Sequence, residues 1–481
     1  MTDTELARIE EARAVFRRQK SHSSPSSAPT YGERIDRLER VETLCRSHVD
    51  EITEALQADF GCRNPDMTFI ADIFPQLDHI GYVKRKLSKW MKRERAGWSP
   101  LSLTGQRTYV IHEPLGVVGI ISPFNAPLSL ALVPAVEALA AGNSVMIKIS
   151  ESTPRTSGLL ESLVARYFRA EEMAAISGGV EMSRAFAALP WDLLFFTGGS
   201  EVGRKILAAT AGNLTPTVLE LGGKSPCVLL EDADVGEAAR KIGRVRQMNA
   251  GQVCIAGDYA LLPERHLEPF VAAVIEGDAD AYPSILDNPE YTSVIHDGAY
   301  DRLVAYIDEA RAAGCRIVES NPMNEAVPDR ATRKIPLTLV IDPADHLMVS
   351  REEIFGPILP IHTYRKLDDA IAHINRGGKP LALYVFGRNR RRIDRILHST
   401  SSGGVTVNDL LLHAGSHTMG FGGVGQSGMG RYKGGHIGYK AFSNPKSVFE
   451  QGIMRRFTGM FFVPYGSDRT RRILRNRVGV G

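Results

Sequence analysis

The chain has 481 residues, of which 43% are hydrophobic and 23% charged, and its formal net charge is only +3. A chain this long exceeds the size of one hydrophobic core and predicts several domains, while the nearly balanced charge lacks the basic excess of a nucleic-acid-binding protein. The five cysteines are odd in number and none forms a CxxC pair. They argue against a disulfide framework or a zinc site and favour the reducing cytoplasm.

The amino-terminal part of the chain is predicted to be helical. Residues 1–20 are acidic first and basic later and lack the apolar run of a signal peptide, so an exposed amphipathic helix is expected. After a Ser/Pro-rich joint at 21–29, apolar residues recur at helical spacing over 31–92, interrupted by a turn-like segment at 59–66. We assign residues 1–102 to a helical layer. No stretch of the chain reaches ~18 uninterrupted apolar residues, so no membrane-spanning helix is expected.

The period of the hydrophobic pattern then changes. LGVVGIIS at 115–122 and SVMIKI at 144–149 are short β-branched runs that suit buried strands. The strongly apolar segment 127–141 between them predicts a helix that ends at Gly142. The succession of strand, helix and strand indicates a parallel βαβ unit.

The same alternation continues through a helix near 155–168, a strand at 191–196, a helix at 200–211 and a strand at 217–221, which predicts a doubly wound parallel sheet. We assign residues 103–221 to a dinucleotide-binding domain, with an early bridging strand near 105–113. A second set of strands and helices follows, so residues 222–408 are predicted to form a second α/β domain. Ligand sites lie preferentially between domains, and the active site is expected between these two.

Three motifs imitate known sites without their structural context. GFGGVG at 420–425 matches GxGxxG, but it lies in a glycine-rich loop near the carboxyl end and not between a strand and a helix. GGKS at 222–225 resembles the end of a P-loop, yet Val218 stands where the first glycine is needed. His413 and His417 have helix-like ligand spacing but lie in a predicted loop without a third ligand nearby. No metal site is predicted.

Several other motifs occur together in a fixed order: PFNAP, KISE, FTGGSEVG, VLELGGKSP, GQVC and EEIFGPI. In these residues the chain resembles the aldehyde dehydrogenase superfamily, from about the first helical layer to Val448. The spacing between Glu220 in LELGGKSP and Cys254 in GQVC is the one expected from that family. GQVCIAGDY, DFGCR and GMGRYKGG are most similar to class 3 and coniferyl-aldehyde-type members.

The resemblance implies an α/β fold with a doubly wound parallel-sheet cofactor domain, a second α/β catalytic domain and a small β oligomerisation flap. Residues 409–450 would return to the cofactor domain and carry an oligomerisation strand, and 451–481 would form a C-terminal tail. The flap would combine strands near 109–112 and 441–448 in a homodimer or homotetramer. The implied activity is NAD(P)-dependent oxidation of a small-molecule aldehyde to a carboxylic acid.

The same resemblance assigns three catalytic roles. Cys254 would attack the aldehyde carbon and carry a thiohemiacetal and then a thioester; a lowered pKa, a nearby base or the intrinsic nucleophilicity of sulfur would each activate it. The side-chain amide of Asn125 and the backbone N–H of Cys254 would stabilise the oxyanion. Glu220 would activate the water that hydrolyses the thioester. Without the resemblance, Asn125 fits a turn between two prolines, and Glu220 a carboxylate capping a GG turn.

The cofactor would be NAD, with NADP as the alternative. The resemblance places its contacts at Lys148, Glu151, Gly198, Gly199, Ser200, Gly203, Glu353 and Phe355. Glu151 favours NAD because a carboxylate repels a 2′-phosphate. Gly198 and Gly199 precede a helix whose N-terminal N–H groups suit a pyrophosphate. The chain departs from the family pattern at Gly199, where serine is frequent, and at Ile149 and Gly420, which replace prolines.

Rival functions share parts of this pattern. A CoA-acylating aldehyde dehydrogenase would pass the thioester to coenzyme A, but Glu220 disfavours it because such relatives usually lack this base. An acyl-phosphate reductase would lack these NAD motifs. A non-catalytic protein that retains the fold is disfavoured by the intact set of Cys254, Glu220, Asn125 and Lys148. Two classes of aldehyde substrate are compatible with the sequence: aromatic, coniferyl-like aldehydes and medium-chain aldehydes.

Overall fold

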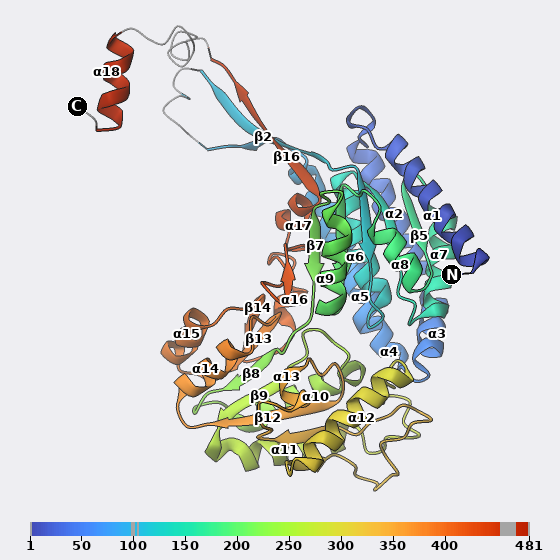
Figure 1. The fold of residues 1–481 in the computed structure, drawn as a ribbon, viewed down its shortest axis with the longest axis vertical. Helices are drawn as coiled ribbons and strands as arrows, with labels where there is room; N and C mark the ends of the chain where they lie inside the picture. Colours follow the sequence, from blue (N-terminus) through green and yellow to red (C-terminus); the bar gives the residue numbers. More distant parts are fainter. Residues whose placement is uncertain (1, 98–101, 103–104, 453–467, 480–481) are drawn as a thin grey trace.

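The computed structural model describes residues 2–97, 102, 105–452 and 468–479. They form a six-stranded sheet, a seven-stranded sheet and a three-stranded sheet that projects as an arm (Figure 1). Among the described residues, no helix combines the length and the apolar character needed to cross a bilayer. Of the predicted tail, residues 453–467 and 480–481 lie outside the described residues.

The six-stranded sheet has the order β15-β7-β6-β3-β4-β5, and all its strands are parallel except β15. Its strands are β3 (Val117–Ile121), β4 (Ser144–Lys148), β5 (Met173–Ile176), β6 (Leu193–Thr197), β7 (Thr217–Glu220) and β15 (Gly428–Met429). The helices in this part of the chain are α1 (Asp3–His22), α2 (Tyr31–Ser47), α3 (Val49–Phe60), α4 (Pro65–Thr68), α5 (Phe74–Trp90), α6 (Pro127–Ala141), α7 (Pro154–Tyr167), α8 (Val180–Ala187) and α9 (Ser200–Ala211).

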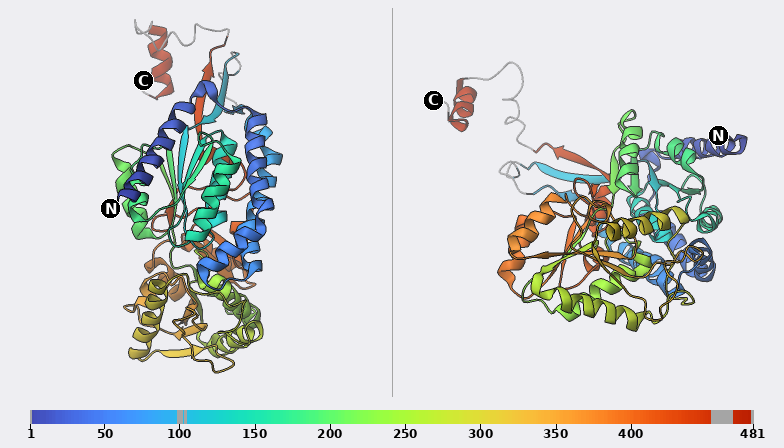
Figure 2. Two further views of the ribbon diagram at one scale, coloured as in Figure 1. Left: turned by 90° about the vertical axis from the view of Figure 1, so that its right-hand side faces the viewer. Right: turned by 60° about the horizontal axis from the view of Figure 1, so that its bottom comes forward.

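Alternation along the strands explains why helices cover both faces of this sheet (Figure 2). Val117 and Ile121 of β3 pack with α1, α8 and α9. Val118 and Ile120 point the other way and pack in the core that α2, α5, α6 and α7 share. The parallel order places the carboxyl ends of β3, β4, β6 and β7 along one edge of the sheet.

The seven-stranded sheet has the order β10-β11-β12-β9-β8-β13-β14, and only β10 is antiparallel to its neighbour. Its strands are β8 (Pro226–Leu229), β9 (Tyr259–Pro263), β10 (Arg316–Glu319), β11 (Thr338–Ile341), β12 (Ile358–Tyr364), β13 (Ala382–Phe386) and β14 (Gly404–Val407). The helices that follow β8 along the chain are α10 (Val235–Gln247), α11 (Leu267–Ala281), α12 (Asp297–Ala312), α13 (Met348–Arg351), α14 (Leu367–Arg376), α15 (Arg390–Ser399), α16 (Leu412–Gly415), α17 (His436–Ala441) and α18 (Asp468–Arg477).

The arm contains β1 (Glu94–Arg95), β2 (Arg107–Pro114) and β16 (Ser443–Glu450). β2 and β16 are antiparallel neighbours in register from Ser443 opposite Pro114 to Glu450 opposite Arg107. The two strands expected to meet in a flap are therefore paired. They leave the body of the molecule together, and much of β16 is exposed (Figure 1).

Two details differ from the expectations. β5 and α8 lie in a stretch for which the hydrophobic pattern predicted no element. His413 lies in the short helix α16 and not in a loop, because its backbone N–H and its ring Nδ1 both contact the Thr406 hydroxyl, at 3.3 and 2.9 Å. GFGGVG, in contrast, lies in a loop as expected.

Candidate active site

A cavity of about 800 Å³ lies at the carboxyl ends of the parallel strands of the six-stranded sheet. Lys148 and Glu220 reach it as the last residues of β4 and β7, and Cys254 and Glu353 enter it from the second α/β part. The predicted site residues that line it are Asn125, Lys148, Glu151, Gly198, Gly199, Glu220, Cys254, Glu353 and Phe355. Segments far apart in sequence thus converge on one space, hereafter the catalytic cavity.

The loop before Cys254 has an unusual backbone. Asn249 and Ala250 both have φ of 54°, a left-handed conformation that non-glycine residues rarely adopt and that is common at functional sites. The Asn249 side chain donates hydrogen bonds to the carbonyl oxygens of Asn125 at 3.0 Å and Gln252 at 3.3 Å. These contacts hold the cysteine loop against the segment that carries Asn125.

The Glu220 carboxyl is buried, with 3% of the residue exposed. Neither of its side-chain oxygens has a hydrogen-bond partner in the part of the chain that the structure describes. Burial raises the pKa of Glu220 well above its ordinary value, while Arg431 and Lys433 act in the opposite direction. A carboxyl group that is desolvated and unpaired in a cavity is suited to accept a proton near neutral pH.

The Cys254 thiol has no lowered pKa. Burial, together with the nearby carboxylates of Glu353 and Glu220, raises its pKa to about 12. The sequence left three routes of activation open: a lowered pKa, a nearby base and the intrinsic nucleophilicity of sulfur. The structure does not provide the first of them, a lowered pKa.

Lys148, which also lines the catalytic cavity, is nearly inaccessible, and its Nζ lies 2.6 Å from Glu151 Oε2. Gly199 precedes α9 as its N-cap, and a Cβ there would meet open space. The first N–H groups of α9 therefore face a space that a phosphate can enter.

Two predicted cofactor residues, Ser200 and Gly203, do not line the cavity. The Ser200 hydroxyl donates a hydrogen bond to the Gln426 carbonyl at 3.2 Å. Gly203 uses its N–H to bond the Gly199 carbonyl at 3.0 Å, and a Cβ on it would collide with Leu221. Gly203 thus allows α9 to pack closely, and its amide is not free to bind a cofactor.

The loop that carries Glu353 and Phe355 is held by a polar network that sequence reasoning missed. The Lys224 ammonium donates to Asp258 Oδ2 at 2.6 Å and to the Glu352 carbonyl at 3.0 Å. Asp258 Oδ1 accepts the Ile354 N–H at 3.0 Å. Both Lys224 and Asp258 stand inside quoted motifs, LELGGKSP and GQVCIAGDY, but only the fold shows that they position this loop.

Glu353 itself is closely packed. A Cβ on Gly222 would collide with its carboxylate, and burial raises its pKa to about 8. The Phe355 ring meets the Phe124 ring edge to face, with centroids 5.8 Å apart. Together these side chains form a mixed acidic and aromatic wall next to Cys254.

Comparison of the chain with known protein families agrees with this geometry. The family model described as "Aldehyde dehydrogenase family" matches residues 1–448. The chain belongs to the aldehyde dehydrogenase family. Two similar proteins are "Coniferyl aldehyde dehydrogenase" of Pseudomonas sp. strain HR199, 42% identical over 94% of this chain and 93% of that protein, and "Aldehyde dehydrogenase, dimeric NADP-preferring" of Mus musculus, 35% identical over 87% and 90%.

Solved structures of aldehyde dehydrogenases share the fold. "Substrate bound state of Staphylococcus Aureus AldH" superposes with a TM-score of 0.86 at 33% identity, covering 92% of this chain and 94% of that one. "NAD+ complex structure of aldehyde dehydrogenase from bacillus cereus" gives a TM-score of 0.81 at 25% identity, with coverage of 92% and 89%. The predicted family, fold class and NAD(P)-dependent oxidation of aldehydes are confirmed.

In this aldehyde dehydrogenase, the RYK segment of GMGRYKGG is a further site element that sequence reasoning missed. Tyr432 and Phe421 line the catalytic cavity. Lys433 Nζ lies 5.8 Å from the Phe421 ring centroid and 5.9 Å from that of Tyr432. Its positive charge stabilises the ionised form of Glu220 and lowers the pKa of that carboxyl.

Replacing Lys433 by methionine is expected to shift the pH profile of kcat. Glu220 must be deprotonated to accept a proton from water, so turnover rises with pH through the pKa of this carboxyl, which burial has already raised. Loss of the Lys433 charge raises that pKa further and moves the acid limb to higher pH. Steady-state rates measured across the pH range check this. Lys433→Arg keeps the charge and should keep the wild-type limb; coincident limbs for Met and wild type would contradict the expectation.

Proposed function

We propose that this chain oxidises aromatic aldehydes of the coniferyl type through a thioester on Cys254, with medium-chain aldehydes as the alternative. The observation that carries the proposal is the buried carboxyl of Glu220, which has no hydrogen-bond partner within the described part of the chain and lines the same cavity as Cys254. Support for aromatic substrates comes from the rings of Phe124, Phe421 and Tyr432 on the cavity wall and from the name of the Pseudomonas relative.

The first half of the proposed reaction forms the thioester. The Cys254 sulfur bonds to the carbonyl carbon while its proton moves to Glu220, a transfer that the raised pKa of this carboxyl favours. The Asn125 amide and the Cys254 N–H donate hydrogen bonds to the resulting oxyanion. Bound NAD(P)+ supplies the hydride acceptor, and the C–H bond of the thiohemiacetal is the one that breaks.

The second half hydrolyses the thioester. After its proton has passed to solvent, Glu220 removes a proton from a water molecule that attacks the thioester carbon. The C–S bond breaks, the carboxylic acid leaves and the Cys254 sulfur regains a proton. Because this carboxyl has no competing partner among the described residues, its oxygen lone pairs are free to accept a hydrogen bond that a water molecule donates.

The residues fit a dinucleotide. Lys148 and Glu151 form a pair that can contact ribose hydroxyls, and the open N-terminus of α9 after Gly199 suits the pyrophosphate. The exposed valines Val180 of α8 and Val202 of α9 also line the cavity and offer an apolar slot for a base. We propose that Glu353 and Phe355 contact the nicotinamide end.

Replacing Glu151 by serine is expected to improve the use of NADP relative to NAD. The change removes a carboxylate that repels a 2′-phosphate, and it leaves the cationic Lys148 without its partner at 2.6 Å. The ratio of kcat/KM for the two cofactors, measured at saturating aldehyde, checks this. Glu151→Gln is the matched control for size, and it should move the ratio in the same direction. An unchanged ratio in both variants would place Glu151 away from the ribose.

Replacing Asn125 by alanine is expected to lower kcat by roughly 10²–10³-fold, the usual effect of removing one oxyanion donor. The Asn125 backbone carbonyl still accepts the Asn249 hydrogen bond in the variant, so the cysteine loop keeps its anchor. Cofactor affinity, followed by the fluorescence of bound NADH, should stay near the wild-type value. A loss of affinity as large as the loss of kcat would show a structural role instead.

A panel of aldehydes tests the substrate. Purified protein is assayed with coniferyl-type, medium-chain and short aliphatic aldehydes, with NAD or NADP, by the absorbance of the reduced cofactor. Higher kcat/KM for the aromatic aldehydes supports the proposal, and activity confined to short aliphatic aldehydes overturns it. Added coenzyme A should leave the product a free acid, whereas an acyl-CoA product would support the CoA-acylating alternative.

We also propose that the arm of β2 and β16 joins subunits in a homodimer or homotetramer. Support comes from the exposure of β16, including Phe449, which is 54% exposed on a strand edge. Sedimentation of the full chain tests it. The domain limits and the cytoplasmic location expected from the scattered cysteines stay predictions.

A further inference from the structure

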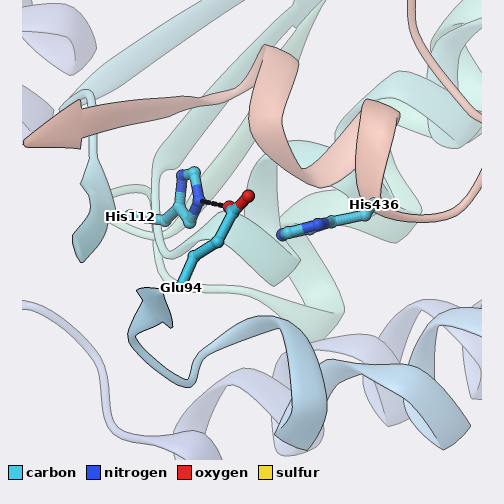
Figure 3. Close-up of side chains that lie close together, drawn as sticks. All are labelled: Glu94, His112 and His436. Atoms are coloured by element: carbon cyan, nitrogen blue, oxygen red, sulfur yellow. Dashed lines mark hydrogen bonds and ion pairs between the residues drawn. The ribbon is translucent and has the colours of Figure 1, made fainter. Parts of the chain in front are cut away.

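Three side chains meet at the base of the arm, outside the catalytic cavity. Glu94 of β1, His112 of β2 and His436 at the start of α17 each offer a ligand atom, and these atoms lie within 4.8 Å of one another. His112 Nε2 is 2.9 Å from Glu94 Oε2. Figure 3 shows the Glu94 carboxylate between the two imidazole rings.

The two rings are held in place by their neighbours. The side chain of His112 is only 2% exposed. The ring of His436 is stacked on those of Trp90 and Tyr439, with interplanar angles of 13° and 24°, and meets His112 edge to face. His436 Nε2 is buried and has no hydrogen-bond partner among the described residues. A buried imidazole nitrogen without a partner calls for an explanation, and a bound cation is one.

We propose that Glu94, His112 and His436 bind a divalent transition-metal ion, with zinc the best fit. Two imidazoles and one carboxylate form a donor set that zinc uses, with a water molecule in the fourth position. Tetrahedral bonds of ~2.1 Å require donor atoms roughly 3.4 Å apart, so the ligand atoms, which lie within 4.8 Å of one another, must move closer together. Glu94 can supply that movement, since its side chain is 41% exposed while His112 is fixed.

Lys440 competes for the same carboxylate. Its Nζ lies 2.8 Å from Glu94 Oε2 and 3.0 Å from Oε1. An ammonium at this distance repels a second cation, so the metal must displace it. The Lys440 side chain is 40% exposed and can turn to solvent when the metal binds. Removal of the Lys440 charge should therefore strengthen metal binding. Binding at an adventitious site elsewhere on the surface would not respond to this change.

The proposed metal would join three segments that are distant in sequence. β1 and β2 are strands of the arm, whereas α17 lies directly before β16. A metal held by side chains of all three segments would fix β1 and β2, at the base of the arm, to α17. None of the three ligands lines the catalytic cavity, so the proposed role is structural and is separate from aldehyde oxidation.

The test uses the full chain, stripped of metal with a chelator and titrated with Co²⁺, whose visible bands report nitrogen and oxygen ligands in a low-symmetry site. One Co²⁺ per chain, displaced by Zn²⁺, is expected. His436→Gln and His112→Gln should each weaken binding at least ~10-fold. Lys440→Met should tighten it, and the exposed His346→Gln is the control that should leave it unchanged.

Two outcomes overturn the proposal. One is the absence of stoichiometric binding by the folded wild-type chain. The other is binding that neither histidine variant weakens, or that shows the near-ultraviolet charge-transfer band of a thiolate, which would place the metal on Cys254 or another cysteine. Far-ultraviolet circular dichroism confirms that each variant is folded, and a rise of Tm with Zn²⁺ that is lost in His112→Gln provides a second readout.

Discussion

Replacing Cys254 by alanine is expected to lower kcat by roughly 10⁴-fold or more, because no other thiol lines the catalytic cavity among the residues that the structure describes, and no thioester can form without it. The loss should fall on kcat and leave cofactor binding intact, since the proposed cofactor contacts at Lys148 and Gly199 do not involve the Cys254 thiol. The measurement is the initial rate of NAD(P)H formation with the best aldehyde of the panel.

The matched control is Cys62→Ala. The Cys62 thiol is partly accessible and lies 3.7 and 3.6 Å from the carbonyl oxygens of Asn288 and Pro289, away from the catalytic cavity. Its loss should leave the rate within a small factor of wild type. Turnover that survives in Cys254→Ala would mean that aldehyde oxidation here does not use a covalent intermediate on this residue.

Replacing Glu220 by glutamine is expected to lower steady-state kcat by roughly 10²–10⁴-fold, the contribution of a general base. Glutamine has nearly the size of glutamate but cannot take a proton from water, so the thioester forms and then persists. Rapid mixing should show a burst of one NAD(P)H per active site followed by a slow steady rate.

The burst separates the two proposed roles of Glu220. Because burial holds the Cys254 thiol protonated, the burst should be slower than the first turnover of wild type and should speed up as pH rises. Added hydroxylamine, a stronger nucleophile than water, should restore turnover by attacking the thioester. A uniform slow rate with no burst at any pH would show that Glu220 acts only before hydride transfer.

Local signals account for the parts of the fold that the sequence predicts well. α6 spans Pro127–Ala141 as expected because a proline occupies its first turn and Gly142 ends it in the left-handed conformation. α9 begins at Ser200, directly after the glycines of FTGGSEVG. β5 was missed because MAAI at 173–176 has a single β-branched residue, and its pairing with β4 stabilises it.

The residues of the site were predictable from the sequence, but the burial of these residues and the charges around them were not. Motif order placed Cys254, Glu220 and Asn125, and the fold brings all three to one cavity. No local pattern indicates that the pKa of the thiol is raised, because the burial that raises it comes from distant segments. Lys433 and the pair of Lys224 and Asp258 act through tertiary contacts in the same way.

In two further cases the role of a residue depends on tertiary contacts that the sequence does not reveal. FTGGSEVG indicates a cofactor turn, but only packing against Leu221 shows that Gly203 serves close helix contact and not the cofactor. Glu94, His112 and His436 have no ligand spacing in sequence, and they meet only because the arm pairs β1 with β2 beside α17. Candidate sites built from three separate segments require the fold.

Whether aldehyde oxidation passes through a thioester on Cys254 can be read from the mass of the Glu220→Gln enzyme after reaction with the aldehyde and oxidised cofactor. A thioester intermediate predicts a covalent adduct on the peptide that contains Cys254, which is heavier by the mass of the aldehyde minus two hydrogens. The adduct should be absent without cofactor and removed by hydroxylamine. An adduct on another residue, or rapid turnover with no adduct on Cys254, would show that the reaction does not pass through a thioester on this cysteine.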